Sequence, residues 1–289
     1  MSTSSEPVVL YDVAEGIATV TLNRPEYRNA QNLEMLYALD DAFRRAVADE
    51  EVRVIVLTGA GQVFSSGHDI GSPGRDVHVQ YPSRAALWPP YTEAVAGEER
   101  WAREVEIYLE MCRRWRAISK PTIAMVNGPA IAGGLMLAWV CDLITASTTA
   151  YFADPVVAMG VPGVELFAHP WEFGTRLAKE MLLTGAPVSA QRGYEVGMVS
   201  FVAEPDELVT RTRELAARIA TRERFALAIT KVAVNRAQDA MGFHIGIDSV
   251  FGLHQLAHSH NAEISGHGNR GVGVDAVRSS LRSTGEEPA

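Results

Sequence analysis

Apolar and polar residues alternate at the start of the chain and then change to a helical spacing. Residues 8–25 (VVLYDVAEGIATVTLNRP) alternate on either side of a Glu-Gly pair, which predicts a hairpin whose second strand stops at Pro25. Apolar residues three or four positions apart predict a helix over 32–52, with Asn32 as its N-cap. The β-branched run at 53–61 (RVIVLTGAG) predicts a buried parallel strand, so a βαβ unit opens the fold.

The same order of elements returns further along the chain. Residues 121–134 (PTIAMVNGPAIAGG) predict a strand and a glycine turn, and the apolar run at 135–142 predicts a helix. Two more strands are expected at 143–148 (LITAST) and 150–154 (AYFAD). The pattern is that of an α/β fold.

Beyond Glu204 the pattern changes to long helices. Helical spacing continues over 206–222 and 225–241, with a further helical stretch at 249–260. We therefore expect a core over residues 1–203 and a helical C-terminal region over 204–289, which ends in a tail rich in Gly and Ser.

Composition narrows the class of protein. The chain has 289 residues, 47% of them hydrophobic, and no apolar run reaches the ~18 residues of a membrane span. The N-terminus lacks a basic start and an apolar stretch of signal-peptide length, so we expect a cytoplasmic protein. A net charge of −9 disfavours binding to nucleic acid.

Cys112 and Cys141 lie in apolar or mixed helical segments and are expected to be buried thiols.

Two glycine turns carry the first candidate chemistry. Residues 64–70 (FSSGHDI) and 130–136 (AIAGGLM) each follow a predicted strand and open into a helix. Backbone N–H groups at such places are unpaired and suit a negative charge that develops on an oxygen, so two converging turns predict an oxyanion hole. The alternative is that these glycines only let a strand and a helix pack closely.

Four segments together resemble the enoyl-CoA hydratase/isomerase (crotonase) superfamily. They are GIATVTLNRPEYRNAQN (16–32), VIVLTGAGQVFSSGHDI (54–70), KPTIAMVNGPAIAGGLMLAWVCDLITAS (120–147) and KEMLLTGAPVSAQRGYEVGMVSFV (179–202). The resemblance implies a spiral of ββα repeats and a helical C-terminal region used in trimerisation, as a homotrimer or a dimer of trimers. It also implies an acyl-CoA thioester as substrate, with coenzyme A as part of that substrate and no separate cofactor.

The resemblance also suggests roles for particular residues. The oxyanion hole would use the backbone N–H groups of His68 and Gly133. Coenzyme A would lie along Arg28 and along the loop that contains Ser66, Asp69 and Ile70, and these four residues are its expected contacts. A plain surface role remains the alternative for Arg28.

The chain departs from the family where proton transfer is expected. Family hydratases use two glutamates, and the matching positions here are Met136 and Val156, whose side chains cannot move a proton. Ordinary hydration is therefore disfavoured. Glu165 is the leading candidate acid or base, because partial burial among apolar neighbours would raise its pKa toward neutrality, although capping or salt-bridging the start of a helix is the alternative. His169, four residues later, would share a helical face with Glu165, or would be a packed histidine. Asp154 is expected to cap a helix or hydrogen-bond within a loop, and it is a secondary candidate for catalysis.

Two further features lie outside the family pattern. The interval 71–119 is long and contributes Tyr81, Trp88, Tyr91, Trp101 and Tyr108, which either line an acyl pocket or anchor the insertion to the surface. His254 and His258 have the spacing of a helical metal pair, and His260 is close by. No acidic residue completes a ligand set at helical spacing, so we expect interface packing and no metal.

The expected activity is that of an acyl-CoA enzyme that stabilises a thioester enolate or oxyanion. Isomerisation or related chemistry with Glu165 is favoured over plain hydration. Two alternatives remain open, a thioester hydrolase and a member that binds CoA thioesters with altered or lost catalysis.

Overall fold

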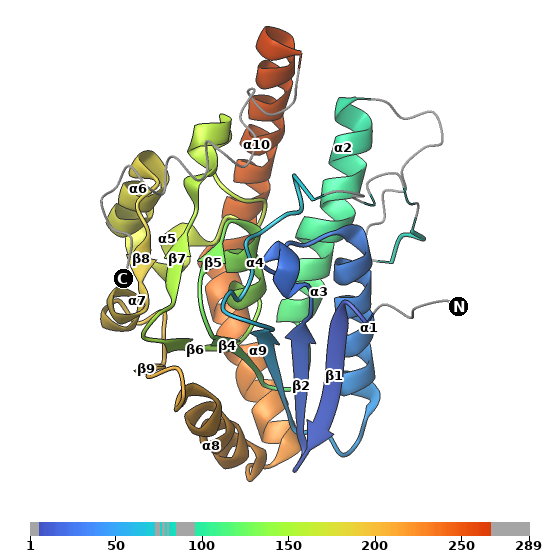
Figure 1. The fold of residues 1–289 in the computed structure, drawn as a ribbon, viewed down its shortest axis with the longest axis vertical. Helices are drawn as coiled ribbons and strands as arrows, with labels where there is room; N and C mark the ends of the chain where they lie inside the picture. Colours follow the sequence, from blue (N-terminus) through green and yellow to red (C-terminus); the bar gives the residue numbers. More distant parts are fainter. Residues whose placement is uncertain (1–5, 73–75, 77–78, 80, 85–95, 267–289) are drawn as a thin grey trace.

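The computed structural model describes residues 6–72, 76, 79, 81–84 and 96–266. A six-stranded sheet lies at the centre of the fold, in the order β1-β2-β3-β4-β6-β9 (Figure 1). β1 and β2 are antiparallel and the other neighbours are parallel. The strands are β1 Val9–Ala14, β2 Ile17–Leu22, β3 Val54–Gly59, β4 Thr122–Val126, β6 Leu143–Ser147 and β9 Phe201–Ala203. The predicted hairpin and the buried parallel strand are confirmed.

A second, smaller sheet consists of β5 (Ala130–Ile131), β7 (Tyr151–Ala153) and β8 (Val188–Ser189). β5 is parallel to β7, and β7 is antiparallel to β8. Because β5 lies directly before the glycines at 133 and 134, this sheet fixes the second glycine turn in space.

Helices cover the sheet where the sequence predicts them. α1 (Leu33–Ala48) begins at Asn32, whose side chain accepts a hydrogen bond from the N–H of Met35, so the predicted N-cap is confirmed. α4 (Gly133–Trp139) follows the second glycine turn and is buried along its whole length. The remaining shorter elements are the 3-10 turns Pro25–Tyr27 and Pro155–Met159, α5 His169–Glu172, α6 Gly174–Thr184 and α7 Ala190–Glu195.

The long interval after the first turn contains a helical run of its own. α2 (Gly97–Glu104) continues through a π-helical stretch at Val105–Glu110 into α3 (Met111–Arg116). Cys112 is buried and Cys141 is half-buried, and both are free thiols. Glu104, Ile107 and Tyr108 of this run line one side of the cavity described below.

Three helices follow the core, as the sequence predicts. α8 (Leu208–Ala220) packs its apolar face on the sheet, against residues that include Val54 and Ile123. α9 is Arg224–Ala240, and α10 is one continuous helix over Phe243–Ser265. None of the described helices is long and apolar enough to cross a membrane.

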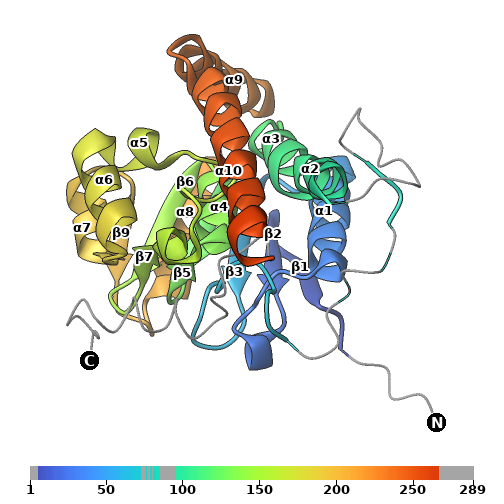
Figure 2. The ribbon, with the colours of Figure 1, turned by 90° about the horizontal axis from the view of Figure 1, so that it is seen from above.

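α10 carries a buried stripe into the interior. Phe243, Ile247, Phe251, His254 and His258 are buried and follow one another at intervals of three or four residues, which places them on one face of the helix. Seen from above, α10 lies between α2 and α3 on one side and α5 and α6 on the other (Figure 2). It therefore brings two histidines close to the glycine turns.

Candidate active site

The two glycine turns lie against each other. The N–H of Ile131 donates a hydrogen bond of 2.9 Å to the carbonyl of Ser65, which joins the second turn to the first. A Cβ on Gly134 would lie 2.4 Å from the same carbonyl oxygen, so only glycine allows this approach. A Cβ on Gly67 would lie 3.0 Å from the backbone nitrogen of Gly133. The predicted convergence of the turns is thus observed.

The backbone N–H groups of His68 and Gly133 are free of protein acceptors within the described part of the chain. His68 forms a parallel bridge with Gln31. In this bridge the N–H of Gln31 donates to the carbonyl of Gly67, and the N–H of Asp69 donates to the carbonyl of Gln31. The N–H of His68 takes no part in the bridge. Gly133 is the first residue of α4, where an N–H has no intrahelical acceptor. Both groups are available to an oxygen of a ligand.

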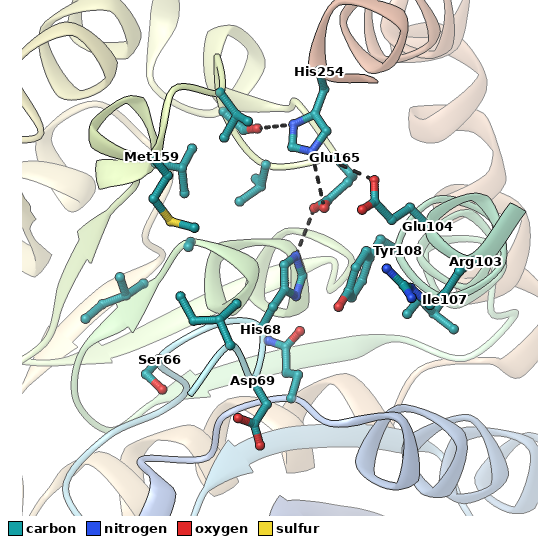
Figure 3. A pocket seen from close by; sticks show the side chains of 18 of the residues that line it. Ser66, His68, Asp69, Arg103, Glu104, Ile107, Tyr108, Met159, Glu165 and His254 are labelled. Carbon is teal, nitrogen blue, oxygen red and sulfur yellow. Dashed lines mark hydrogen bonds and ion pairs between the residues drawn. The ribbon is translucent and has the colours of Figure 1, made fainter. Parts of the chain in front are cut away.

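The imidazole of His68 fills the space beside Gly133. A Cβ on Gly133 would lie 2.5 Å from Cε1 and 2.7 Å from Nδ1 of this ring, so the absence of a side chain makes room for it. The ring stacks on Tyr108 with centroids 3.7 Å apart. Its Nε2 lies 2.9 Å from Oε2 of Glu165 (Figure 3). His68 was expected in the oxyanion hole through its backbone N–H, and its side chain also contacts the predicted acid or base.

Glu165 is buried among groups that favour its ionised form. Oε1 lies 3.6 Å from Nε2 of His254, on the opposite side from His68. Burial raises the pKa of Glu165, but the charge and hydrogen bond of His68 and the charge of His254 outweigh it and lower the pKa to about 2. The carboxylate is therefore held as an anion between two imidazoles, and the expectation of a raised pKa for Glu165 is wrong because two histidines lie beside it.

The expectation that Glu165 and His169 share a helical face is wrong. α5 begins only at His169, with Pro170 in its first turn, and Glu165 lies in the preceding loop. His169 is fully buried, and its Nε2 lies 2.9 Å from Oδ2 of Asp154. It is not among the described residues that line the cavity. The structure pairs His169 with Asp154, the secondary candidate, and separates it from Glu165.

A cavity of about 250 Å³ adjoins the two glycine turns. Val156, which the resemblance matches to one family glutamate, lines it together with Met159 and Val161. Met136, which the resemblance matches to the other, is buried in the hydrophobic core and is not among the lining residues described. The polar and charged lining includes Gln31, Ser66, His68, Asp69, Glu104, Glu165 and His254.

The residues expected to contact coenzyme A fall into two places. Ser66, Asp69 and Ile70 line the cavity. Asp69 also binds Nη1 of Arg24 at 3.0 Å, and although burial raises its pKa, the bonds from Ser72 and Arg24 lower it overall. Arg28 is exposed and lines a neighbouring hollow that shares Ile131 with the cavity.

The aromatic residues of the interval 71–119 divide between the two expected roles. Tyr108 lines the cavity and stacks on His68. Tyr81 stacks on Tyr37, and Trp101 packs on Phe251, so these two anchor the segment to the body of the protein. Trp88 and Tyr91 lie outside the described residues.

Sequence reasoning missed Glu104, a buried carboxylate at the end of α2. Burial and the nearby charge of Glu165 raise its pKa to about 7, while His254 and Gln255 act in the opposite direction. The spacing of Glu104 and Tyr108, four residues apart in a helical run, was the available signal. An acidic residue preceding an aromatic one is common in solvated helices, so this signal is weak.

His254 and His258 also face the cavity. Both are buried inside the chain, so the expectation that they serve interface packing is wrong for these two residues. His260, by contrast, is exposed. The two imidazoles lie beside Glu104, which comes from a distant part of the sequence.

A spiral α/β fold with a helical C-terminal region and two free amides at one cavity defines the crotonase class of proteins. The family model described as enoyl-CoA hydratase/isomerase matches residues 12–96 and 92–243. The chain belongs to this family, and the family expected from the sequence is confirmed.

Individual relatives agree with this assignment. A putative enoyl-CoA hydratase, EchA13 of Mycobacterium tuberculosis, is 46% identical and covers 86% of this chain and 80% of its own length. The crystal structure of a probable enoyl-CoA hydratase from Mycobacterium smegmatis has a TM-score of 0.81 at 44% identity, over 90% of this chain and 98% of that one. An (E)-benzylidenesuccinyl-CoA hydratase from Thauera aromatica is 35% identical over 81% of this chain and 84% of its own.

Proposed function

We propose that the chain is an enzyme that acts on an acyl-CoA thioester and stabilises an enolate or similar oxyanion at the N–H groups of His68 and Gly133. The observation that carries this proposal is the presence of two free amides from separate turns at one cavity that also contains a buried carboxylate. Such preorganised donors stabilise negative charge that develops on a carbonyl oxygen.

The proton-transfer group in this proposal is Glu165, paired with His68. The 2.9 Å hydrogen bond lets a proton that either group takes from the substrate be shared between them. Val156 and Met136 offer no acid or base at the places where family hydratases have theirs. Double-bond isomerisation, or another reaction through an enolate that needs one such group, is therefore favoured over hydration by the two-glutamate route.

Coenzyme A is placed outside the cavity mouth in this proposal. Ser66, Asp69 and Ile70 would contact the pantetheine arm, since they line the cavity beside the amides. Arg28 would face the phosphates from the adjoining hollow, where its exposed guanidinium is free to bind an anion. His169 does not reach the cavity, and its proposed role is to position the loop that carries Glu165.

The test is turnover against a panel of enoyl-, dienoyl-, hydroxyacyl- and aroyl-CoA substrates, with binding of each measured in parallel. Glu165→Gln is expected to abolish turnover while CoA thioester binding survives. Unchanged turnover would remove Glu165 from the mechanism. Binding without any turnover would favour a non-catalytic member, and release of free coenzyme A as the main product would favour a thioester hydrolase.

We also infer self-association through the C-terminal helices. Large apolar side chains are exposed on α9 and α10, among them Phe225, Val234, Ile245, Leu253 and Leu256. Exposed apolar faces of this kind mark interaction surfaces. A homotrimer, or a dimer of trimers, is expected by light scattering, and a monomer at micromolar concentration would contradict it.

A further inference from the structure

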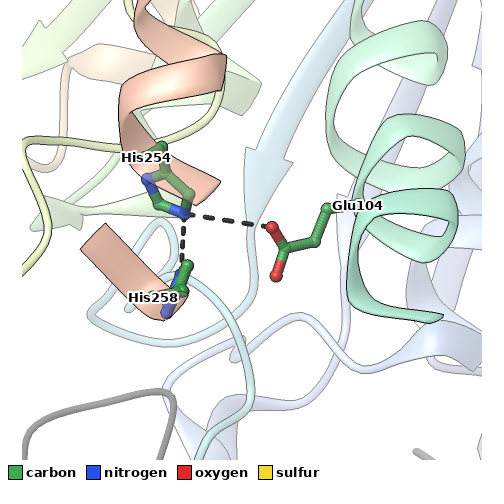
Figure 4. A group of neighbouring side chains, drawn as sticks. All are labelled: Glu104, His254 and His258. Atoms are coloured by element: carbon green, nitrogen blue, oxygen red, sulfur yellow. Dashed lines mark hydrogen bonds and ion pairs between the residues drawn. The ribbon is translucent and has the colours of Figure 1, made fainter. Parts of the chain in front are cut away.

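We propose that Glu104, His254 and His258 form a binding site for a divalent transition metal of the zinc class. One ligand atom from each residue lies within 4.8 Å of the others, and all three residues are buried (Figure 4). Glu104 comes from the end of α2 and the two histidines from α10, so the fold brings together what the sequence separates. The proposal goes beyond the acyl-CoA activity and does not depend on it.

The distances between the donor atoms are close to those between ligands of one bound metal ion. The Nε2 atoms of His254 and His258 are 2.9 Å apart, and Oε2 of Glu104 lies 3.9 Å from Nε2 of His254. Zinc bonds of about 2.0–2.2 Å in a tetrahedral arrangement place neighbouring donors roughly 3.2–3.5 Å apart. The two separations of 2.9 and 3.9 Å lie on either side of this range, and all three donors lie within 4.8 Å of one another, so side-chain shifts on the order of 1 Å place them around one ion.

The groups around the ligands orient them for metal binding. Nδ1 of His254 lies 2.8 Å from the carbonyl oxygen of Gly163. A carbonyl only accepts, so Nδ1 carries a proton, and Nε2 is the nitrogen that can give up its proton to an ion and direct its lone pair at the cluster. Gln255 donates a hydrogen bond from Nε2 to the carboxylate of Glu104, and Arg100 in turn binds Gln255 at 3.1 Å. His254 and Glu104 therefore each have a hydrogen-bond partner of the kind that orients a metal ligand.

The donor set indicates the class of ion. Two imidazoles and one carboxylate suit zinc and neighbouring transition metals, whereas magnesium and calcium prefer oxygen ligands alone. Three protein ligands leave at least one coordination position open. Because all three residues line the cavity, this position would face the acyl-binding space and would hold water or an oxygen of a ligand.

The competing explanation is a hydrogen bond between the two imidazoles, with no ion. Measuring metal content distinguishes the two. Tag-free protein is stripped with a chelator, exchanged into zinc chloride solution, desalted and analysed by plasma mass spectrometry, with calorimetric titration of zinc alone in parallel. We expect about one zinc per chain, no binding of magnesium, and an increase in Tm with zinc concentration.

Variants locate the ion. His258→Ala and Glu104→Gln are each expected to weaken zinc affinity by about 100-fold or more, since even the loss of an outer partner costs 10–100-fold. His260→Ala is the matched control, because this exposed histidine lies on the same helix, and it should retain full zinc binding. Glu104→Gln preserves shape and so guards against misfolding, which circular dichroism checks. Wild-type protein that binds no zinc, or variants that bind it as the wild type does, would overturn the proposal.

Discussion

The imidazole of His68 lies between the Glu165 carboxylate, 2.9 Å from its Nε2, and Gly133, whose missing side chain leaves space for the ring. One residue thus supplies a backbone N–H to the proposed oxyanion hole and a side chain to the proposed proton-transfer pair. This arrangement couples the two parts of the site, because any movement of the first glycine turn also moves the partner of Glu165.

The two roles of His68 can be separated by mutation. His68→Phe keeps the backbone N–H and an aromatic ring against Tyr108 but cannot hydrogen-bond Glu165. On the best substrate of the panel we expect kcat to fall by about 10²–10⁴-fold with little change in KM, the range for loss of general acid–base catalysis. His68→Gln retains a donor and should lose less. If both variants kept the wild-type kcat, only the backbone of His68 would be used.

Alanine at the two adjacent glycines should have different effects. In Gly133→Ala the new Cβ would meet side-chain atoms, the His68 ring and Oε1 of Gln31, so the ring moves and kcat falls while the fold survives. In Gly134→Ala the new Cβ would meet the carbonyl of Ser65, a backbone atom that cannot move without separating the turns. We expect a loss of stability of at least about 1–3 kcal/mol there, the typical cost of overpacking. Thermal unfolding and kcat, measured on both variants, test this difference.

Local pattern predicted most of the fold. Alternation at residues 8–25 and helical spacing at 32–52 match β1, β2 and α1, because each of these elements has one buried face. The spacing of Glu165 and His169 predicts a helix, but Glu165 lies in the loop before α5. There Val164 donates to Asp154 and Gly163 accepts from His254, so tertiary hydrogen bonds replace the helical ones.

The site was only partly predictable. Glycine turns after strands identified the two amides, since that chemistry depends on local backbone geometry. Glu165 and His68 are 97 residues apart in the sequence. The contact of Glu165 with His254 joins a loop to α10. No periodicity within one segment reports such contacts. The same holds for Glu104, which joins the site only because α2 packs against α10 in the folded chain.

A carboxyl outside the site should make stability depend on pH. Glu172, half-buried at the end of α5, has its pKa raised from 4.5 to about 7 by burial, against a smaller opposing effect of Arg116. The folded state then binds this proton more tightly than the unfolded state, so stability falls as pH rises from about 4.5 to 7 and stays lower above that.

Glu172→Gln should remove this dependence. At pH 8 we expect the variant to be more stable by about 1–3 kcal/mol, since one pKa unit corresponds to about 1.4 kcal/mol, and at pH 4 no more stable than wild type. Each kcal/mol corresponds to about 2–4 °C in Tm for a chain of this size. Glu180→Gln, at an exposed position on α6, is the control. A Tm difference that is the same at both pH values would contradict the assignment.

The buried pair of Asp154 and His169 should act on Glu165 through the loop between them. Oδ2 of Asp154 accepts a hydrogen bond from the N–H of Val164, at 3.0 Å, and lies 2.9 Å from Nε2 of His169. Val164 directly precedes Glu165, so the Asp154 carboxylate fixes the backbone that positions the proposed proton-transfer side chain. His169→Gln would leave a buried carboxylate short of one partner, and we expect both Tm and kcat to fall, with a stability loss of about 3–5 kcal/mol at most.

A double variant distinguishes positioning from catalysis. In Asp154→Asn with His169→Gln no charge is left buried, and an amide can still accept from Val164, so stability and kcat should recover together relative to His169→Gln alone. If His169 instead exchanged protons with the substrate, the double variant would regain its Tm without regaining kcat. Thermal unfolding and steady-state kinetics on the two variants, with the wild type as reference, therefore decide whether His169 acts through the loop or at the reacting atoms.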